Sequence, residues 1–213
     1  MDIQWFGQSC VKIKSKKATI VTDPYDANFT GLKKLKLSGD ILTISHDHED
    51  HNARQVVEGE PVILWGPGEY EVKGVRIKGV LSFHDNKQGK ERGRNTIFVF
   101  NVEDVNICHL GDLGHTLTSE QLEAIGAIDV LFVPVGGTYT IDGGEAVQII
   151  AQIEPKIIVP MHYALPDLKF DLHGVEEFLK AYGQHKPEMV SKLSISADKM
   201  PEVTQVTLLE KSN

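Results

Sequence analysis

Short apolar runs separated by glycine and polar turn residues dominate the first half of the chain. Clusters of β-branched and aromatic residues predict strands at residues 3–6, 10–14, 18–22, 41–44, 61–65, 70–73, 75–83 and 96–102. The run at residues 41–44 is apolar except for one threonine, which favours a strand covered on both faces. Residues 52–57 are expected to form a short helix, and the lysine-rich residues 31–40 a solvated loop.

Helical patterns join the strands in the second half. Thr118-Ser119-Glu120-Gln121 matches a capping box and predicts that a helix begins there. Two further helices are expected at residues 144–153 and 175–182, and strands at residues 105–110, 129–135, 157–159 and 203–209. Strands precede helices in each half, which favours two packed sheets with helices outside. No Pro-, Gly- or Ser-rich linker divides the halves, so residues 1–213 are expected to form one domain.

Composition and charge exclude several classes of binding partner for this protein. The chain has 213 residues, is 41% hydrophobic and carries a formal charge of −8, which argues against generic binding to nucleic acid or anionic lipid. No apolar run approaches the ~20 residues of a membrane span. The first residues show no signal-peptide pattern, and two cysteines cannot build a disulfide framework. We therefore expect a cytoplasmic protein with no membrane partner; the sequence leaves its oligomeric state open.

A histidine-rich segment directly after the strand at residues 41–44 is the first candidate for chemistry. His46 and His48 project from the same side of an extended segment and can converge on one ion, while Asp50 and His51 can serve a second. Imidazole and carboxylate donors suit zinc, manganese, iron or nickel. Because six residues cannot enclose two ions, further ligands are expected at the ends of other apolar strands: His84, Asp112 and His162.

These residues carry a resemblance to a known superfamily. SHDHEDH at residues 45–51 resembles the His-x-His-x-Asp-His signature of metallo-β-lactamase-fold hydrolases. Thr22-Asp23-Pro24, Gly111-Asp112 and Met161-His162 resemble its other motifs, in the superfamily's order. The compact size and HLGDLGH most resemble the branch of ascorbate-6-phosphate lactonase and the N-acylphosphatidylethanolamine phospholipase D-like enzymes. The resemblance implies an α/β fold, a four-layer αββα sandwich of two mixed β-sheets with helices on the outer faces.

The resemblance also implies a ligand set. It assigns His46, His48 and His84 to a first ion; Asp50, His51 and His162 to a second; and Asp112 to a bridge, with Asp50 and Asp112 as the catalytic carboxylates. The implied cofactor is two divalent metal ions per chain, zinc foremost, with manganese, iron or nickel as alternatives. Such a pair activates water directly, which agrees with a sequence that has neither a GxSxG nucleophile elbow nor an activated cysteine.

Four neighbouring positions have alternative interpretations. Asp23 is expected to orient a ligand histidine, or to act only as a turn residue before a proline. His84 is favoured over His109 as the middle ligand, because His109 lies inside a strand with a parity opposite to that of Asp112. His115 is a candidate proton donor or substrate contact, or a plain loop residue.

The predicted activity is hydrolysis of an ester-like bond, phosphodiester or lactone foremost, in a small-molecule substrate. A basic loop follows His84, and its cations, above all Arg92 and Arg94, could recruit a phosphorylated substrate to an otherwise acidic protein. The alternative is that this loop is merely solvated. A non-catalytic metal-binding or sensing module on the same fold is the alternative function, and the general acid for the leaving group is left open.

Overall fold

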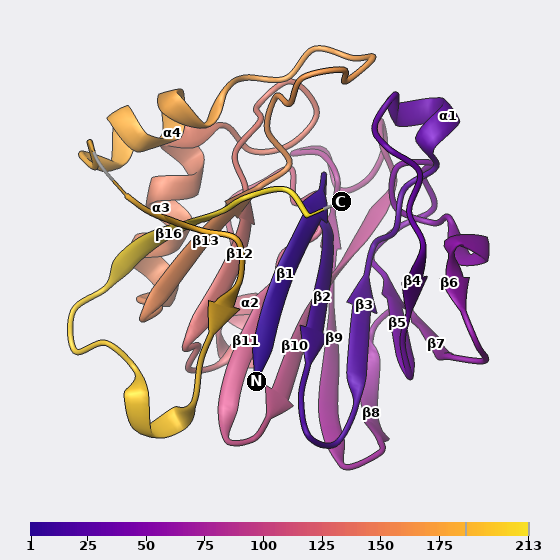
Figure 1. Cartoon of the computed structure of the whole chain (residues 1–213). Coiled ribbons are helices and arrows are strands. Elements are labelled where there is room, and N and C mark those ends of the chain that lie inside the picture. The colour runs from indigo at the N-terminus through magenta and orange to yellow at the C-terminus, as the bar shows by residue number, and fades with distance from the viewer. Residues whose placement is uncertain (186, 213) are drawn as a thin grey trace.

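Two mixed β-sheets packed face to face form the centre of the computed structural model, which describes residues 1–185 and 187–212 (Figure 1). One sheet has the strand order β15 (Leu193–Ser194), β1 (Asp2–Gly7), β2 (Cys10–Lys14), β3 (Thr19–Thr22), β5 (Ile41–Ile44) and β7 (Val62–Trp65). The other has the order β14 (Glu188–Val190), β16 (Gln205–Leu209), β13 (Ile157–Met161), β12 (Val130–Pro134), β11 (Val105–His109), β10 (Arg94–Val102), β9 (Val75–Phe83) and β8 (Gly68–Val72). The αββα fold class expected from the sequence is confirmed.

Three helices accompany the eight-stranded sheet: α2 (Ser119–Ile125), α3 (Gly143–Ile153) and α4 (Val175–Tyr182). Thr118 caps α2 in a complete capping box, as predicted. Asp142 caps α3 in the same way, so this helix begins one residue earlier than the sequence indicated. Within the described residues, no helix is long and apolar enough to cross a membrane.

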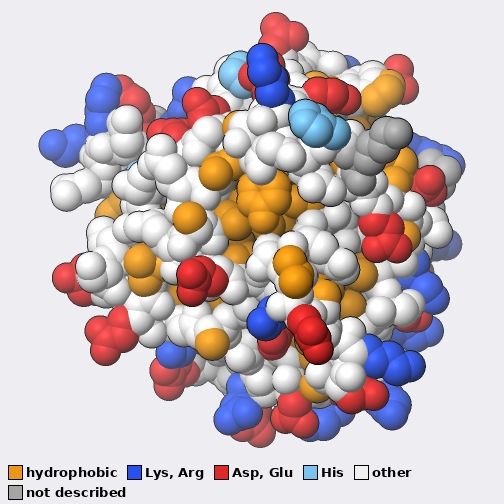
Figure 2. All heavy atoms as spheres, turned by 90° about the vertical axis from the view of Figure 1, so that its left-hand side faces the viewer, with side chains coloured by type: hydrophobic (Ala, Val, Ile, Leu, Met, Phe, Trp, Pro, Cys, Tyr) orange, Lys and Arg blue, Asp and Glu red, His pale blue; other side chains and the backbone are white. Residues whose placement is uncertain are grey.

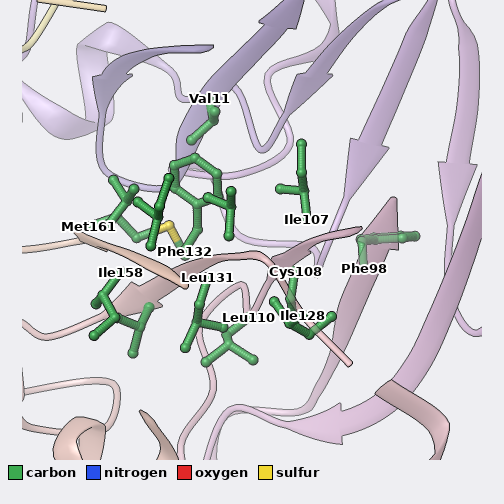
Figure 3. Close-up of a cluster of buried hydrophobic side chains, with 14 of the residues drawn as sticks. Val11, Phe98, Ile107, Cys108, Leu110, Ile128, Leu131, Phe132, Ile158 and Met161 are labelled. Atoms are coloured by element: carbon green, nitrogen blue, oxygen red, sulfur yellow. The ribbon is translucent and has the colours of Figure 1, made fainter. Parts of the chain in front are cut away.

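The main core lies between the two sheets. Figure 3 shows side chains from both sheets in contact there, among them Val11 of β2 and Phe132 of β12. Phe98, Phe132 and Met161 are at most 1% exposed, and burying a side chain of this size contributes about 1.5–3 kcal/mol to folding. Strands anchored in this core give rigid starting points to the loops that follow them.

The layer outside the six-stranded sheet differs from the sequence prediction. It contains α1 (Ala27–Thr30), a parallel pair of two-residue strands, β4 (Leu37–Ser38) and β6 (Val57–Glu58), and a 3₁₀ turn at Arg54–Val56 in place of the helix expected at residues 52–57. Leu32, Leu35 and Leu37 are buried in a second apolar cluster against this sheet, and the intervening lysines face solvent. The segment expected to be a loop is therefore a covering layer, whose elements are too short to show a period.

Apolar side chains also reach the surface on the side where α3, α4 and β16 lie. Figure 2 turns this side toward the reader and shows hydrophobic side chains near its centre with charged ones around them. Such exposure is ordinary on protein surfaces, and we assign this face no function.

Candidate metal centre

The candidate ligands follow strands that end at one edge of the two sheets, the upper edge in Figure 1. Strands β9, β11 and β13 run in the same direction, because β9 and β11 are both antiparallel to β10, and β11, β12 and β13 are parallel. His84, Asp112 and His162 therefore emerge at the same edge. Residues 45–51 reach it from the end of β5, which is parallel to β3 in the other sheet.

The structure brings all seven expected ligands together in two groups. The ligand atoms of His46, His48 and His84 lie within 4.8 Å of one another, and so do those of Asp50, His51, Asp112 and His162. Asp112 lies between the groups, because its Oδ2 is 3.3 Å from Nε2 of His84 and 3.1 Å from Nε2 of His51. A carboxylate that bridged two ions would occupy such a position.

The donor atoms are suited to divalent cations. Nε2 of His51 and Nε2 of His162 are buried and make no hydrogen bond, although Oδ2 of Asp112 lies 3.1 and 3.3 Å away. Buried polar atoms are nearly always satisfied, and a cation shared by these imidazole nitrogens and the carboxylate would satisfy all three groups. Imidazole and carboxylate are donors that zinc and related first-row ions accept. The residues present therefore fit the implied ions.

Burial and charge set the protonation of these groups: His84 and His46 are ready to bind an ion, whereas His51 must release a proton when it binds one. Burial lowers the pKa of His84 to about 4 and the pKa of His46 well below its ordinary value, so both rings are neutral at pH 7. Burial is the largest single influence on His51 and opposes its charged form, but the carboxylates of Asp112, Asp50 and Asp23 together outweigh it and raise the pKa of His51 well above the usual range. Burial likewise disfavours ionised Asp112, yet the nearby imidazoles hold its pKa well below normal.

Asp23 and Ser45 orient two of the candidate ligand histidines. Asp23 is 1% exposed, and its Oδ2 lies 3.1 Å from Nδ1 of His51. It accepts hydrogen bonds from the backbone N–H of Ser45 at 2.7 Å and from Ser45 Oγ at 2.5 Å. Ser45 Oγ in turn lies 3.0 Å from Nδ1 of His46. Both imidazoles thus meet a fixed partner on Nδ1, which turns Nε2 toward the other candidate ligands; Nε2 of His46 lies 3.0 Å from Nδ1 of His48.

Sequence reasoning missed Ser45 and Asn95. Asn95 Oδ1 accepts the backbone N–H of Asp112 at 3.0 Å and so fixes the start of that loop. Gly111 has a φ of +57°, and a Cβ there would stand 2.4 Å from the same Oδ1. Ser45 could have been suspected from its place directly before His46; no local signal marks Asn95, which acts from a different strand.

His109 and His115 lie beside the ligand groups. His109 is 1% exposed, its Nε2 donates to the backbone oxygen of Ser9 at 2.8 Å, and its Nδ1 accepts from the N–H of Gly111 at 3.2 Å. Both nitrogens are therefore occupied, and His84 takes the place expected of the middle ligand. Nε2 of His115 accepts the N–H of Phe83 at 3.1 Å, and His115 does not line the cavity described next, so we do not propose it as a proton donor.

A cavity of about 510 Å³ opens over the candidate ligands. Five of the ligand side chains reach it, together with two acids, one arginine and three aromatic rings: His48, Asp50, His84, Asp112, His162, Asp47, Glu49, Arg92, Phe29, Tyr139 and Phe170. Arg94, the second cation singled out in the sequence, lines a neighbouring groove with Trp65 and Leu81 instead. The three aromatic residues were not identified from the sequence.

Two packed mixed sheets with a histidine–aspartate cluster at their strand ends are the arrangement of the metallo-β-lactamase fold. A family model described as a beta-lactamase superfamily domain matches residues 2–162. The chain belongs to the metallo-β-lactamase superfamily.

Several relatives are named as metal-dependent hydrolases. A UPF0173 metal-dependent hydrolase of Thermoplasma acidophilum is 30% identical over 193 residues, covering 79% of this chain and 85% of the relative. One of Staphylothermus marinus is 31% identical over 219 residues, covering 88% and 93%. A crystal structure from Thermotoga maritima, described as a candidate Zn-dependent hydrolase of the metallo-beta-lactamase superfamily, is 42% identical with a TM-score of 0.82 and covers 98% of this chain and 97% of its own.

Proposed function

We propose that the chain is a metal-dependent hydrolase that holds two divalent ions, zinc foremost, and cleaves an ester-like bond in a small molecule, phosphodiesters and lactones being the leading classes. The observation that carries this proposal is the meeting of two ligand groups at Asp112 beneath an open cavity. The names of the two archaeal relatives, both metal-dependent hydrolases, support it.

Each ligand has a defined role in this proposal. His46, His48 and His84 hold one ion, Asp50, His51 and His162 the other, and Asp112 both. When bound, two such ions supply Lewis-acid activation of water and stabilise charge on the substrate oxygen.

Asp50 is the carboxylate that we assign to the attacking water. Burial disfavours its charge, but His51 and His162 hold the pKa of Asp50 below its ordinary value, so it is ionised at pH 7. It lines the cavity and can accept a hydrogen bond from the water. Neither cysteine is an alternative nucleophile, because both are buried and burial raises the pKa of Cys10 and of Cys108.

Metal analysis and a substrate screen test the proposal together. Protein purified without chelator should contain close to two divalent ions per chain, and Asp112→Ala should lower this content while the surface variant Glu123→Ala should not. The metal-loaded protein should hydrolyse at least one member of a panel of lactones, phosphodiesters and thioesters, and chelation should abolish that activity. Full metal content without hydrolysis would favour the sensing module; absence of metal binding would overturn the proposal.

A further inference from the structure

Three aromatic rings and one guanidinium form a continuous row along one wall of the cavity. The ring centroids of Phe29 and Phe170 are 5.7 Å apart, and those of Phe170 and Tyr139 are 6.1 Å apart. Arg92 completes the row, with its Cζ 4.9 Å from the centre of the Tyr139 ring. The four residues come from α1 and from three separate loops, yet all of them line the cavity over the candidate ligands.

Hydrogen bonds to backbone oxygens tie the aromatic part of this row together. The N–H of Lys169 donates to the backbone oxygen of Thr30 at 2.9 Å, and Lys169 Nζ donates to that of Asn28 at 2.6 Å. These bonds join the loop of Phe170 to α1, which carries Phe29. The N–H of His173 donates to the oxygen of Gly136 at 2.8 Å and joins the same loop to the turn that precedes Tyr139. The wall is therefore formed before any ligand arrives.

Asp85 fixes the loop that presents Arg92. Its buried carboxylate accepts four backbone N–H groups, from Lys87 and Gly89 on Oδ1 at 2.8 Å each, and from Glu91 and Arg92 on Oδ2 at 3.0 and 2.8 Å. The basic loop is thus an ordered turn around one carboxylate, and the backbone of Arg92 is part of it.

The charge of Arg92 has no partner within residues 1–185 and 187–212. Its guanidinium makes neither an ion pair nor a hydrogen bond there, whereas Lys87 in the same loop pairs with Glu91 at 2.6 Å. Stacking on Tyr139 uses the face of the guanidinium and leaves its edge N–H donors for an anion. Arg92 is also the one Lys or Arg among the described residues that line the cavity, and the acids Asp47 and Glu49 line it as well.

We infer that the substrate carries an apolar, preferably aromatic, group and a separate anionic group, in addition to the bond that is cleaved. This inference rests on the proposed function, which places the scissile bond over the candidate ligands. The apolar group lies against Phe29 and Phe170. The Phe29 side chain is 42% exposed, and covering its ring removes apolar surface from water, which favours binding. The anionic group, a carboxylate or a phosphate, meets the edge of Arg92.

Three phosphonates of increasing size separate the parts of this site. Methylphosphonate offers only the group that binds the metals, benzylphosphonate adds the aromatic ring, and 4-carboxybenzylphosphonate adds the second anion. Calorimetric titration of the zinc-loaded protein should show that benzylphosphonate binds about tenfold more tightly than methylphosphonate. The third should bind about fivefold tighter again.

Two variants assign each gain to its residue. Phe170→Ala should remove most of the gain from the ring, and Arg92→Gln should remove the gain from the carboxylate, while neither changes the affinity for methylphosphonate. Lys90→Gln removes a charge from the same loop outside the cavity. Trp65→Ala removes an aromatic ring that is 45% exposed and lines the neighbouring groove, which Arg92 also reaches, but not the cavity. Neither substitution should alter either gain. Circular dichroism and metal content confirm that each variant is folded and loaded.

The possible results are distinguishable. Equal affinity for all three phosphonates, or gains that survive in Phe170→Ala and Arg92→Gln, would overturn the inference and leave the proposed function intact. Failure of all three to bind to protein that holds its metal would count against both. A carboxylate gain lost in Lys90→Gln as well would show that general charge, not Arg92, attracts the anion.

Discussion

Replacing Asp23 by asparagine should disable the centre without disturbing the packing around it. The backbone N–H of Ser45 can only donate, so the amide oxygen of the new side chain must stay at the position of Oδ1. The amide NH₂ then takes the place of Oδ2, 3.1 Å from Nδ1 of His51 and 2.5 Å from Ser45 Oγ, and donates where a carboxylate accepted. Nδ1 of His51 must become an acceptor, so the neutral ring carries its proton on Nε2.

The same substitution reverses the second hydrogen bond. Ser45 Oγ now accepts from the amide, so its own proton turns toward Nδ1 of His46, 3.0 Å away. Both imidazoles then carry their proton on Nε2, the atom that each would use to bind an ion. Loss of such an orienting partner weakens metal binding by about 10- to 100-fold, or about 1.4–2.7 kcal/mol per ion.

Competition with a chromophoric chelator measures this loss directly. The Asp23→Asn protein should bind zinc about 10- to 100-fold more weakly at both positions and should still unfold cooperatively in the presence of chelator. Asp26→Asn is the matched control, because Asp26 caps α1 through a bond to the N–H of Asn28 that asparagine can also accept. Wild-type affinity in Asp23→Asn would refute the idea that hydrogen-bond direction at Nδ1 prepares the ligands.

Two further comparisons test the position of the ligands. His84→Ala should lower metal content more than His109→Ala. His109→Ala should instead lower the free energy of unfolding by about 1–3 kcal/mol, because its buried hydrogen bonds are lost. Metal analysis and thermal unfolding separate the two effects, and a greater loss of metal in His109→Ala would refute the assignment. In Gly136→Ala the new Cβ would lie 2.1 Å from the backbone oxygen of His162. We expect the free energy of unfolding to fall by about 1–3 kcal/mol and zinc to bind more weakly. Gly144→Ala is the control, because the nearest neighbour of its new Cβ is a side-chain oxygen at 3.3 Å. Unchanged zinc affinity in Gly136→Ala would contradict this reasoning.

The fold was predictable where an element is long enough to show a pattern. The strand Ile41–Ile44 was recognised because burial on both faces demands an apolar run, and α2 because the capping box at Thr118 is a local hydrogen-bond pattern. The pair β4 and β6 was missed, since two-residue strands have no period and form only when leucines such as Leu35 pack on the sheet.

The candidate site divides in the same way. Metal ligands are restricted to a few residue types, so His46, His48 and Asp112 could be selected from the sequence and grouped before any distance was known. That they bind metal stays a prediction. Phe29, Tyr139 and Phe170 share no motif, because they are more than thirty residues apart in sequence and are brought together only by the loops that carry them. The contact between Arg92 and Tyr139 likewise exists only in the folded chain and has no sequence signal.

The origin of the ligands in both sheets has a mechanical consequence. Residues 46–51 extend from the six-stranded sheet, whereas His84, Asp112 and His162 extend from the eight-stranded one. Cations bound by ligands from both sheets would link the two sheets at this end of the sandwich. The metal affinity would then depend on the spacing of the two sheets. A substitution that opens a cavity in the core between the sheets, far from any donor atom, should therefore weaken metal binding.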